Sequence, residues 1–264
     1  MTEKKKSAKD VRREQLDGFF SKPVVLGDKD KKLLAELVRG AEVCFANAEQ
    51  LFQEASLLRE HKHFCRSIFL HQIAMEECAK VDMIGGAATA LTLGHPVDLN
   101  ALEKGFRDHK AKNFTNAYMA KASEAEVAAR EANDNKAAIE AFENSQRQIH
   151  GYLNTAKNAS MYVDIKDGKF VAPEDVVTEE LALQIAAISY YFMSVTYPRL
   201  APLRRMLDEP NLHAELMAGF GAAMQKALAG EGTMQEMNEA INTCLKEMAA
   251  RMTAREKSES KPRD

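Results

Sequence analysis

The stretch HKHFCRSIFLHQIAMEECAKVDMIGGAATAL, residues 61–91, decides the fold. Its apolar side chains recur every three or four positions, which is the spacing of one face of an α-helix. These apolar positions are Phe64, Ile68, Ile73, Val81 and Ile84. Alanines and glycines between positions 74 and 88 let neighbouring helices approach closely. The pattern therefore predicts one long helix, packed among others.

The same stretch carries charged and titratable side chains in an apolar setting: Arg66, His71, Glu76, Glu77 and Lys80. At about 100° per residue, Arg66, Glu77 and Lys80 share a direction with aliphatic residues. Charged groups on a partly buried face are costly unless they are paired. We therefore expect a polar site or a structural polar network on this helix.

The composition excludes several classes of protein. The chain has 264 residues and a formal net charge of −3, so no global charge favours nucleic acid or an anionic membrane. The four cysteines show no CxxC spacing and are typical of reduced, buried residues in a cytosolic protein. No signal peptide precedes the first helix, and no run approaches the roughly 18 apolar residues of a membrane span. We expect a cytoplasmic protein with no membrane association.

The rest of the chain is also patterned for helices, and the predicted fold class is all-α. A tight joint at residues 60–62 makes the helices on either side of it antiparallel neighbours. An extended segment with a turn at Asp167-Gly168 follows the fourth helix, and Pro198 and Pro202 break or kink the fifth. The expected helices cover residues 31–59, 61–93, 98–118, 137–162, 178–197, 211–229 and 233–253, with an exposed helical extension or connector at 123–136.

Three regions follow from this pattern. Residues 1–27 form a basic N-terminal tail and entry segment, and residues 28–208 form a helical bundle with long antiparallel helices. Residues 209–264 form a C-terminal helical hairpin, rich in Met, with a charged tail.

No metal or cofactor site is expected. Ferritin-like di-metal bundles need two Glu-x-x-His pairs and two further Glu on facing helices. This sequence offers one such pair, Glu60–His63, at a predicted helix joint. The HExxH, Walker A, GxGxxG and paired CxxC signatures are absent.

Arg66 and His71 form an Arg-x4-His pattern, with Ser67 directly after the Arg. An Arg that holds phosphate and a His that moves a proton are the groups that cleave RNA without a metal ion. In a straight helix, however, the two side chains point about 140° apart. The alternative is that Arg66 pairs with acids such as Glu77 and that His71 lies on a solvated face.

Glu77 and Lys80 are helix neighbours at i, i+3 and therefore form an ion pair. Because they share a face with Ile73 and Ile84, we expect them to join a buried polar network with Arg66 or with another helix. Such a network can fix the register between helices, serve a functional site, or do both.

The run RDHKAKN, residues 107–113, places His109 and Asn113 on one helix face, with Lys110 and Lys112 elsewhere. A basic patch that contains a His can bind phosphate; the alternative is a solvated helix surface. Beyond Lys157, near the end of the fourth helix, Tyr162 and Asp164 precede the turn, where they can close hydrogen bonds at the end of the helix.

Taken in order, three segments resemble the AbiV family of abortive-infection proteins, a branch of the all-helical HEPN superfamily. The segments are AMEECAK at 74–80, HKAK at 109–112 and KNASMYVDIKDGKFVAP at 157–173. The resemblance spans about residues 33–200 and leaves both ends of the chain outside it.

The resemblance implies a HEPN-like helical bundle, a homodimer, and a role in antiphage defence that halts growth or translation in the infected cell. We also expect RNA and a phage-encoded activator as partners. The positions that match its motifs are Glu76, Glu77, Lys80, His109, Lys110, Lys112, Tyr162 and Asp164. Many HEPN proteins are RNases with Arg-x(4–6)-His on a later helix; here Arg66 and His71 lie on the helix that carries Glu-Glu-x-x-Lys.

Two functions remain open at this point. In the first, the protein is a metal-independent endoribonuclease in which Arg66 or Lys110 holds phosphate and His71 or His109 moves a proton. Glu76 and Glu77 would orient these groups, and Lys80, Lys112 and Asn113 complete the predicted catalytic and phosphate-binding set. In the second, the protein is a non-enzymatic helical interaction protein that binds a phage product or a component of translation. A ferritin-like metal protein is a third hypothesis.

Overall fold

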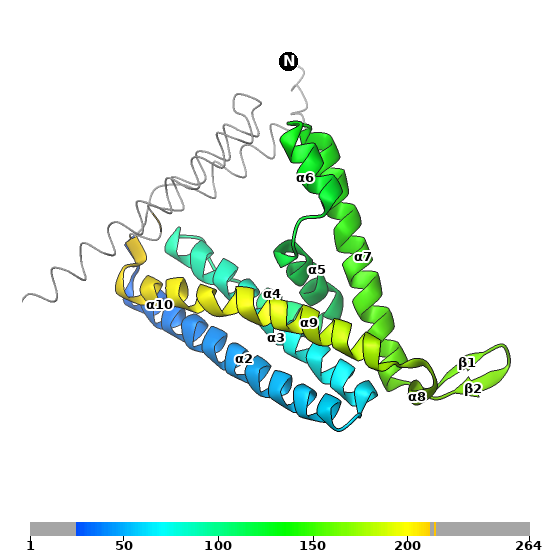
Figure 1. The fold of residues 1–264 in the computed structure, drawn as a ribbon. Helices are drawn as coiled ribbons and strands as arrows, with labels where there is room; N and C mark the ends of the chain where they lie inside the picture. The colour runs from blue at the N-terminus through cyan, green and yellow to red at the C-terminus, as the bar shows by residue number, and fades with distance from the viewer. Residues whose placement is uncertain (1–24, 212–213, 215–264) are drawn as a thin grey trace, which may run out of the picture. The chain divides into compact units, whose positions relative to one another are not determined.

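The computed structural model describes residues 25–211 and 214, except the side chains of residues 114 and 117–119. The predicted N-terminal tail and the C-terminal helical hairpin lie almost entirely outside these residues. Residues 31–88 and 97–207 form one compact unit. Within the described residues the chain is helical apart from one short hairpin, so the predicted all-α class is confirmed (Figure 1).

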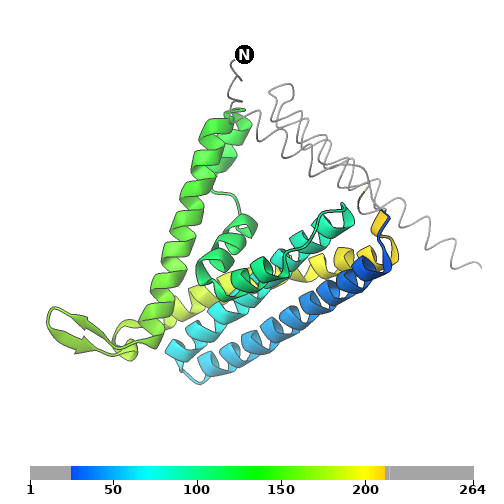
Figure 2. The same cartoon turned by 180° about the vertical axis from the view of Figure 1, so that it is seen from behind.

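Helices α2 (Asp28–Glu60) and α3 (Phe64–Thr92) are the two long helices expected at the start of the bundle. They lie side by side in both views (Figures 1 and 2). The joint between them is a Schellman turn, in which Lys62 has φ 63°, its N–H bonds Arg59 O and the His63 N–H bonds Leu58 O. This turn reverses the chain and makes the helices antiparallel neighbours, as predicted.

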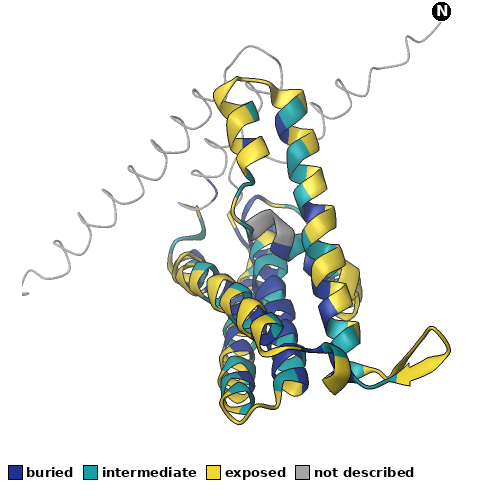
Figure 3. Cartoon of the chain, turned by 45° about the vertical axis from the view of Figure 1, so that its right-hand side comes forward, coloured by how far each residue is buried: buried dark blue, intermediate teal, exposed yellow. Residues whose placement is uncertain are grey.

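The main apolar cluster is built on α3. Figure 3 shows buried residues along most of this helix. Its partners are α7 (Asn135–Met161) and α9 (Glu179–Thr196). The cluster comprises Cys65, Ile68, Met75, Leu153, Ala156, Val177, Ala182, Ile185 and Phe192. On α7, Leu153 and Ala156 face inward, whereas Ile139 and Tyr152 are exposed.

The prediction of a single helix over residues 98–118 is wrong in one respect, because the helix is interrupted at Asp108. Two helices replace it, α4 (Leu99–Arg107) and α5 (His109–Met119). Asp108 is extended, with φ −89° and ψ 104°. Its Oδ1 accepts hydrogen bonds from the N–H groups of Lys110 and Ala111 at 2.8 and 3.2 Å. An Asp that competes for backbone N–H groups in this way favours a helix start over a helix interior.

The stretch predicted as an extension or connector contains the short helix α6 (Glu124–Glu131), which packs along α7 (Figure 1). After α7 comes the predicted turn, flanked by strands β1 (Asp164–Lys166) and β2 (Lys169–Val171). Helix α8 (Pro173–Val176) leads into α9. The chain then forms the 3₁₀ turn η1 (Tyr197–Arg199), where Pro198 interrupts the helix as expected, and α10 (Leu200–Asp208). Pro202 does not break the chain, because it lies in the first turn of α10, where a proline is tolerated.

Among the described residues, α2 begins at Asp28 and α10 ends at Asp208, and residues 210, 211 and 214 beyond it are again helical. The division into three regions stays a prediction. No described helix combines the length and the apolar character that a membrane span needs.

Candidate functional site

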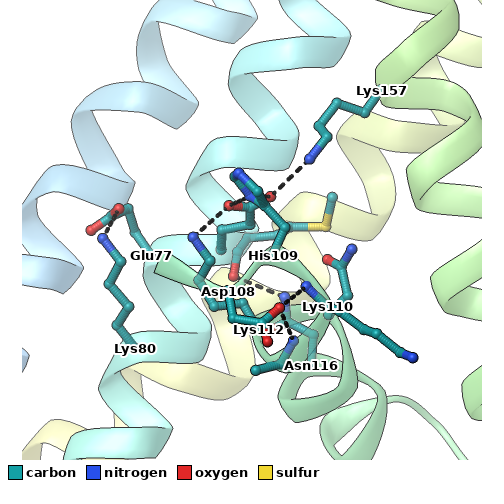
Figure 4. A network of polar contacts seen from close by, with 12 residues as sticks. Glu77, Lys80, Asp108, His109, Lys110, Lys112, Asn116 and Lys157 are labelled. Atoms are coloured by element: carbon teal, nitrogen blue, oxygen red, sulfur yellow. Dashed lines mark hydrogen bonds and ion pairs between the residues drawn. The ribbon is translucent and has the colours of Figure 1, made fainter. Parts of the chain in front are cut away.

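A single buried carboxylate, that of Glu76 on α3, is the centre of the polar cluster. Glu76 is 3% exposed, and three basic side chains reach its two oxygens. Lys112 Nζ lies 2.8 Å from Oε2, and His109 Nδ1 lies 2.7 Å from Oε2 and 2.9 Å from Oε1. Lys157 Nζ lies 3.4 Å from Oε1 (Figure 4). Helices α3, α5 and α7 thus each contribute charge to one cluster.

The break at Asp108 sets the geometry of α5. His109 is the first residue of this helix, and Lys112 lies three residues later on the same face. Both side chains therefore reach the same carboxylate. The prediction that Lys112 points away from His109 is wrong, and so is the alternative of a solvated helix surface, because Lys112 and Asn113 are each only 5% exposed.

Two asparagines on α5 hold this helix against its neighbours. The buried Asn116 donates from Nδ2 to the carbonyl of Met75, the residue before Glu76, at 2.9 Å. Asn113 Nδ2 lies 3.4 Å from Nδ1 of His150 on α7. A buried amide is stable only where such partners exist. The asparagines therefore fix α5 in the position that brings His109 and Lys112 to Glu76.

The lysines keep Glu76 ionised. Burial raises the pKa of the Glu76 carboxyl, but the hydrogen bond and positive charge of Lys112, with His109 and Lys157, outweigh this effect and hold the pKa below its usual value. The cluster then contains one carboxylate and two ammonium groups, an excess of one positive charge even with His109 neutral. Such an excess at a partly open site favours an anionic ligand.

His109 is the part of the cluster that solvent reaches. Its side chain is 59% exposed, although Nδ1 is held by the buried carboxylate. A carboxylate on Nδ1 fixes the tautomer that carries the proton there and leaves Nε2 as the basic nitrogen. The arrangement can therefore take up a proton at Nε2 and stabilise the resulting imidazolium.

Glu77 and Lys80 form a separate ion pair, as predicted. Lys80 Nζ lies 2.5 Å from Glu77 Oε1 and 5.5 Å from the centre of the Phe106 ring. Figure 4 shows Glu77 and Lys80 to one side of His109, with a contact of their own. The pair links α3 to α4 through the cation and the ring. Of the two partners expected for this pair, Arg66 or another helix, the described residues show the second, and Arg66 instead donates to Met161 Sδ at 3.5 Å.

Arg66 and His71 are not brought together. Arg66 is exposed, whereas His71 is fully buried beside the Phe52 ring, with ring centres 5.0 Å apart. Neither ring nitrogen of His71 has a hydrogen-bond partner among the described residues. Burial, and to a lesser extent the charge of Arg59, lowers the pKa of His71 to about 4. His71 therefore does not lie on a solvated face, and no substrate can reach it in this conformation.

Tyr162 and Asp164 are exposed and lie outside the Glu76 cluster. Asp164 Oδ1 accepts a hydrogen bond from the Ile165 N–H at 2.8 Å, which is a local contact. Lys110 is also exposed, beside the cluster in Figure 4. The predicted roles of these three residues stay predictions.

Lys157 and Asn116 complete the cluster, and the sequence-based site omitted both. Lys157 is the first residue of the segment 157–173 that carries the resemblance, so its place in that segment was the available signal. Asn116 lies seven residues after His109, two helical turns along the same face, and only that spacing pointed to it. Among the described residues, no group of three or more His, Cys, Asp or Glu side chains could hold a metal ion.

Comparison with known proteins agrees with the earlier resemblance. The family model HEPN_AbiV, described as AbiV, matches residues 36–192, a range that contains the whole Glu76 cluster. The uncharacterized protein y4gJ of Sinorhizobium fredii (strain NBRC 101917 / NGR234) is 42% identical over 100 residues, which are 38% of this chain and 52% of that protein. The chain therefore spans about half the length of this relative. No solved structure matches the chain.

Proposed function

The chain belongs to the AbiV family of the HEPN superfamily, and from that premise we propose that it is an abortive-infection defence protein that cleaves RNA without a metal ion. It would halt growth or translation in the cytoplasm of an infected cell. The observation that carries the proposal is the contact between the exposed His109 and the buried, ionised Glu76, beside two lysines. These groups supply a proton acceptor and positive charge at one place.

In the proposed reaction His109 Nε2 takes the proton of a ribose 2′-hydroxyl. The 2′ oxygen forms a bond to the adjacent phosphorus, and the bond from phosphorus to the 5′ oxygen breaks. The proton held on Nε2 then passes to the 5′ oxygen, so the products are a 2′,3′-cyclic phosphate and a 5′-hydroxyl. The cleavage is complete without any metal-bound water.

The remaining members of the cluster have distinct roles in this proposal. Glu76 stabilises the imidazolium that forms on His109. Lys157 is the looser of the two lysines on Glu76, at 3.4 Å against 2.8 Å for Lys112, and we assign it to the phosphate oxygens. Lys112 is almost completely buried and keeps Glu76 ionised. Arg66 and His71 have no part in the step, because the two side chains lie apart and His71 is inaccessible.

The direct test is to incubate the purified full chain with tRNA, mRNA and ribosomes in EDTA, with and without extract from phage-infected cells. We expect cleavage that leaves cyclic phosphate ends, and a rate at least about a hundredfold lower for His109→Gln. Gln can still donate a hydrogen bond to Glu76 but takes up no proton near pH 7. The matched control is His63→Gln, at an exposed histidine of the joint between α2 and α3. The absence of cleavage by the wild type under every condition would contradict the proposal.

A second candidate function rests on the burial of the cluster. Glu76 and Lys112 are almost completely buried and neutralise each other's charge, and a purely structural ion pair has the same features. In that case the protein is a non-enzymatic interaction protein that binds a phage product or a component of translation. His109→Gln would then protect cells as well as the wild type does, which separates the two functions.

A further inference from the structure

The hairpin of β1 and β2 carries two large apolar side chains in water. Ile165 is 60% exposed and Phe170 is 80% exposed, and they are direct cross-strand partners on one face. The hairpin projects beyond the end of α7 and is coloured as exposed (Figures 1 and 3). Two strands of three residues each are marginally stable alone and gain stability from further strands. We propose that a second copy of this chain pairs with it, β1 against β1, antiparallel and centred on Ile165.

The backbone of Ile165 is turned toward the free edge of β1. Asp167 and Gly168 have φ angles of 51° and 76°, which is the two-residue type I′ turn. In such a hairpin the residues that flank the turn, Lys166 and Lys169, exchange both backbone hydrogen bonds. The next pair along the strands, which contains Ile165, therefore directs its N–H and C=O outward. Consistent with this, the Ile165 N–H donates to Oδ1 of the neighbouring Asp164 side chain at 2.8 Å.

Charge selects the register of this pairing. When two β1 strands pair antiparallel about Ile165, Asp164 of each copy stands directly opposite Lys166 of the other. A slip of two residues in either direction sets Asp164 opposite Asp164, or Lys166 opposite Lys166, and like charges directly opposite are destabilising. Only the register centred on Ile165 is therefore free of repulsion along this edge.

The opposite edge of the hairpin lacks this complementarity. Pairing two β2 strands about Phe170 would set Lys169 opposite Val171, which leaves the lysine without a counter-charge. The hairpin also suits RNA poorly, since Lys166 and Lys169 are balanced by Asp164 and Asp167 and leave no excess positive charge for phosphates. A second copy, joined through β1, is the occupant that the charges favour.

The proposed pairing also orders the apolar side chains. It creates a four-stranded sheet in which one row reads Phe170, Ile165, Ile165, Phe170 across the two copies. Aromatic and β-branched neighbours across strands are a stabilising combination. The new outer edges are the β2 strands, where Lys169 hinders the addition of another chain.

The test is the mass of the full chain in solution, measured by sedimentation velocity over a range of concentrations. Each charge reversal on β1 alters two symmetry-related contacts, so we expect Asp164→Lys and Lys166→Asp each to raise the dimer Kd at least about tenfold. The double variant Asp164→Lys/Lys166→Asp restores opposite charges and should dimerise like the wild type. An equimolar mixture of the two single variants should form heterodimers, since each lysine then faces an aspartate.

The matched control is Lys169→Asp, which changes the net charge as Lys166→Asp does but lies away from the β1 edge. It should leave the dimer intact, and circular dichroism checks that every variant is folded. A monomeric wild type would overturn the proposal. So would a dimer that both single reversals leave unchanged, or single reversals that the double variant fails to rescue. Loss of RNA binding in these variants with an unchanged dimer would likewise overturn it.

Discussion

At the scale of single residues, the stability of the bundle depends on the charge state of two buried ionisable side chains, Glu76 and His71. Glu76 is surrounded by positive charge and stays ionised, whereas neither ring nitrogen of His71 has a hydrogen-bond partner among the described residues and the ring stays neutral. The cations around Glu76 offset the cost of burying its charge in the bundle. The burial of His71 without a hydrogen-bond partner for its ring instead favours the uncharged form of the imidazole. Substitution of Glu76 should therefore lower the stability of the protein, whereas substitution of His71 should make the protein less sensitive to acid.

Glu76→Gln should lower the free energy of unfolding by about 3 kcal/mol, because it leaves the buried Lys112 ammonium without a counter-charge. Urea denaturation at pH 7 measures the change. Adding Lys112→Met should recover much of the loss, since a neutral side chain of similar length then fills the site. The control is Glu36→Gln, in the exposed pair of Glu36 with Arg39, where we expect little change. Equal losses for the Glu76 and Glu36 variants would contradict this description of the cluster.

His71→Leu should make stability less sensitive to acid. The pKa of His71 is about 4 in the folded chain, against 6.5 in the unfolded chain, so the unfolded chain takes up the proton first as the pH falls. Above pH 6.5, His71 has little effect on the free energy of unfolding of the wild type. By pH 4, protonation of His71 in the unfolded chain lowers that free energy by about 3 kcal/mol. The measurement is the difference in unfolding free energy between wild type and His71→Leu at pH 7 and pH 4. A difference that does not grow at the lower pH would show that His71 is not buried and neutral.

At the scale of secondary-structure elements, the start of α5 determines where the site forms. Asp108 ends α4 and caps α5, which turns His109 and Lys112 toward α3. Without this break, the residue run 107–113 would continue one helix and display its charges around it. The local hydrogen bonds of Asp108 thus determine a contact between residues far apart in the sequence, that of His109 and Lys112 with Glu76.

Asp108→Ala should lower stability by about 1 kcal/mol, the usual loss when a helix cap is removed, and should also release His109 from Glu76. The control is Asp134→Ala, since Asp134 caps α7 through the Ala137 N–H and lies outside the cluster. We expect both variants to lose similar stability in thermal unfolding. Nitrogen NMR should show a mixture of His109 tautomers in Asp108→Ala alone. An unchanged tautomer there would mean that the cap does not position His109.

The sequence predicted the elements better than their contacts. The helical periodicity located α2, α3 and α9, and the Asp-Gly turn located the hairpin. The break at Asp108 was missed because one aspartate within a polar run is a weak signal beside the pattern around it. Periodicity also cannot tell which helix a face meets, so the contacts of Glu76 with Lys112 and Lys157 could not be derived from local spacing. For the same reason the Arg66–His71 pattern suggested a pair that the fold separates.

At the scale of the whole molecule, three helices converge on one charged cluster while the apolar cluster of α3, α7 and α9 supports it. This arrangement joins a rigid interior to one exposed titratable side chain, that of His109. A site held in this way can act without moving any backbone. The chemistry of His109 can therefore be removed with little effect on the fold.

The measurement that tests this claim most directly is plaque formation by phage on cells that express the wild type, His109→Gln or His63→Gln at equal protein levels. We expect the wild type and His63→Gln to reduce plaque numbers equally. We expect His109→Gln, although as stable as the wild type in thermal unfolding, to give no protection. Full protection by a folded His109→Gln protein would mean that His109 has no catalytic role and would leave the Glu76 cluster with a structural role alone.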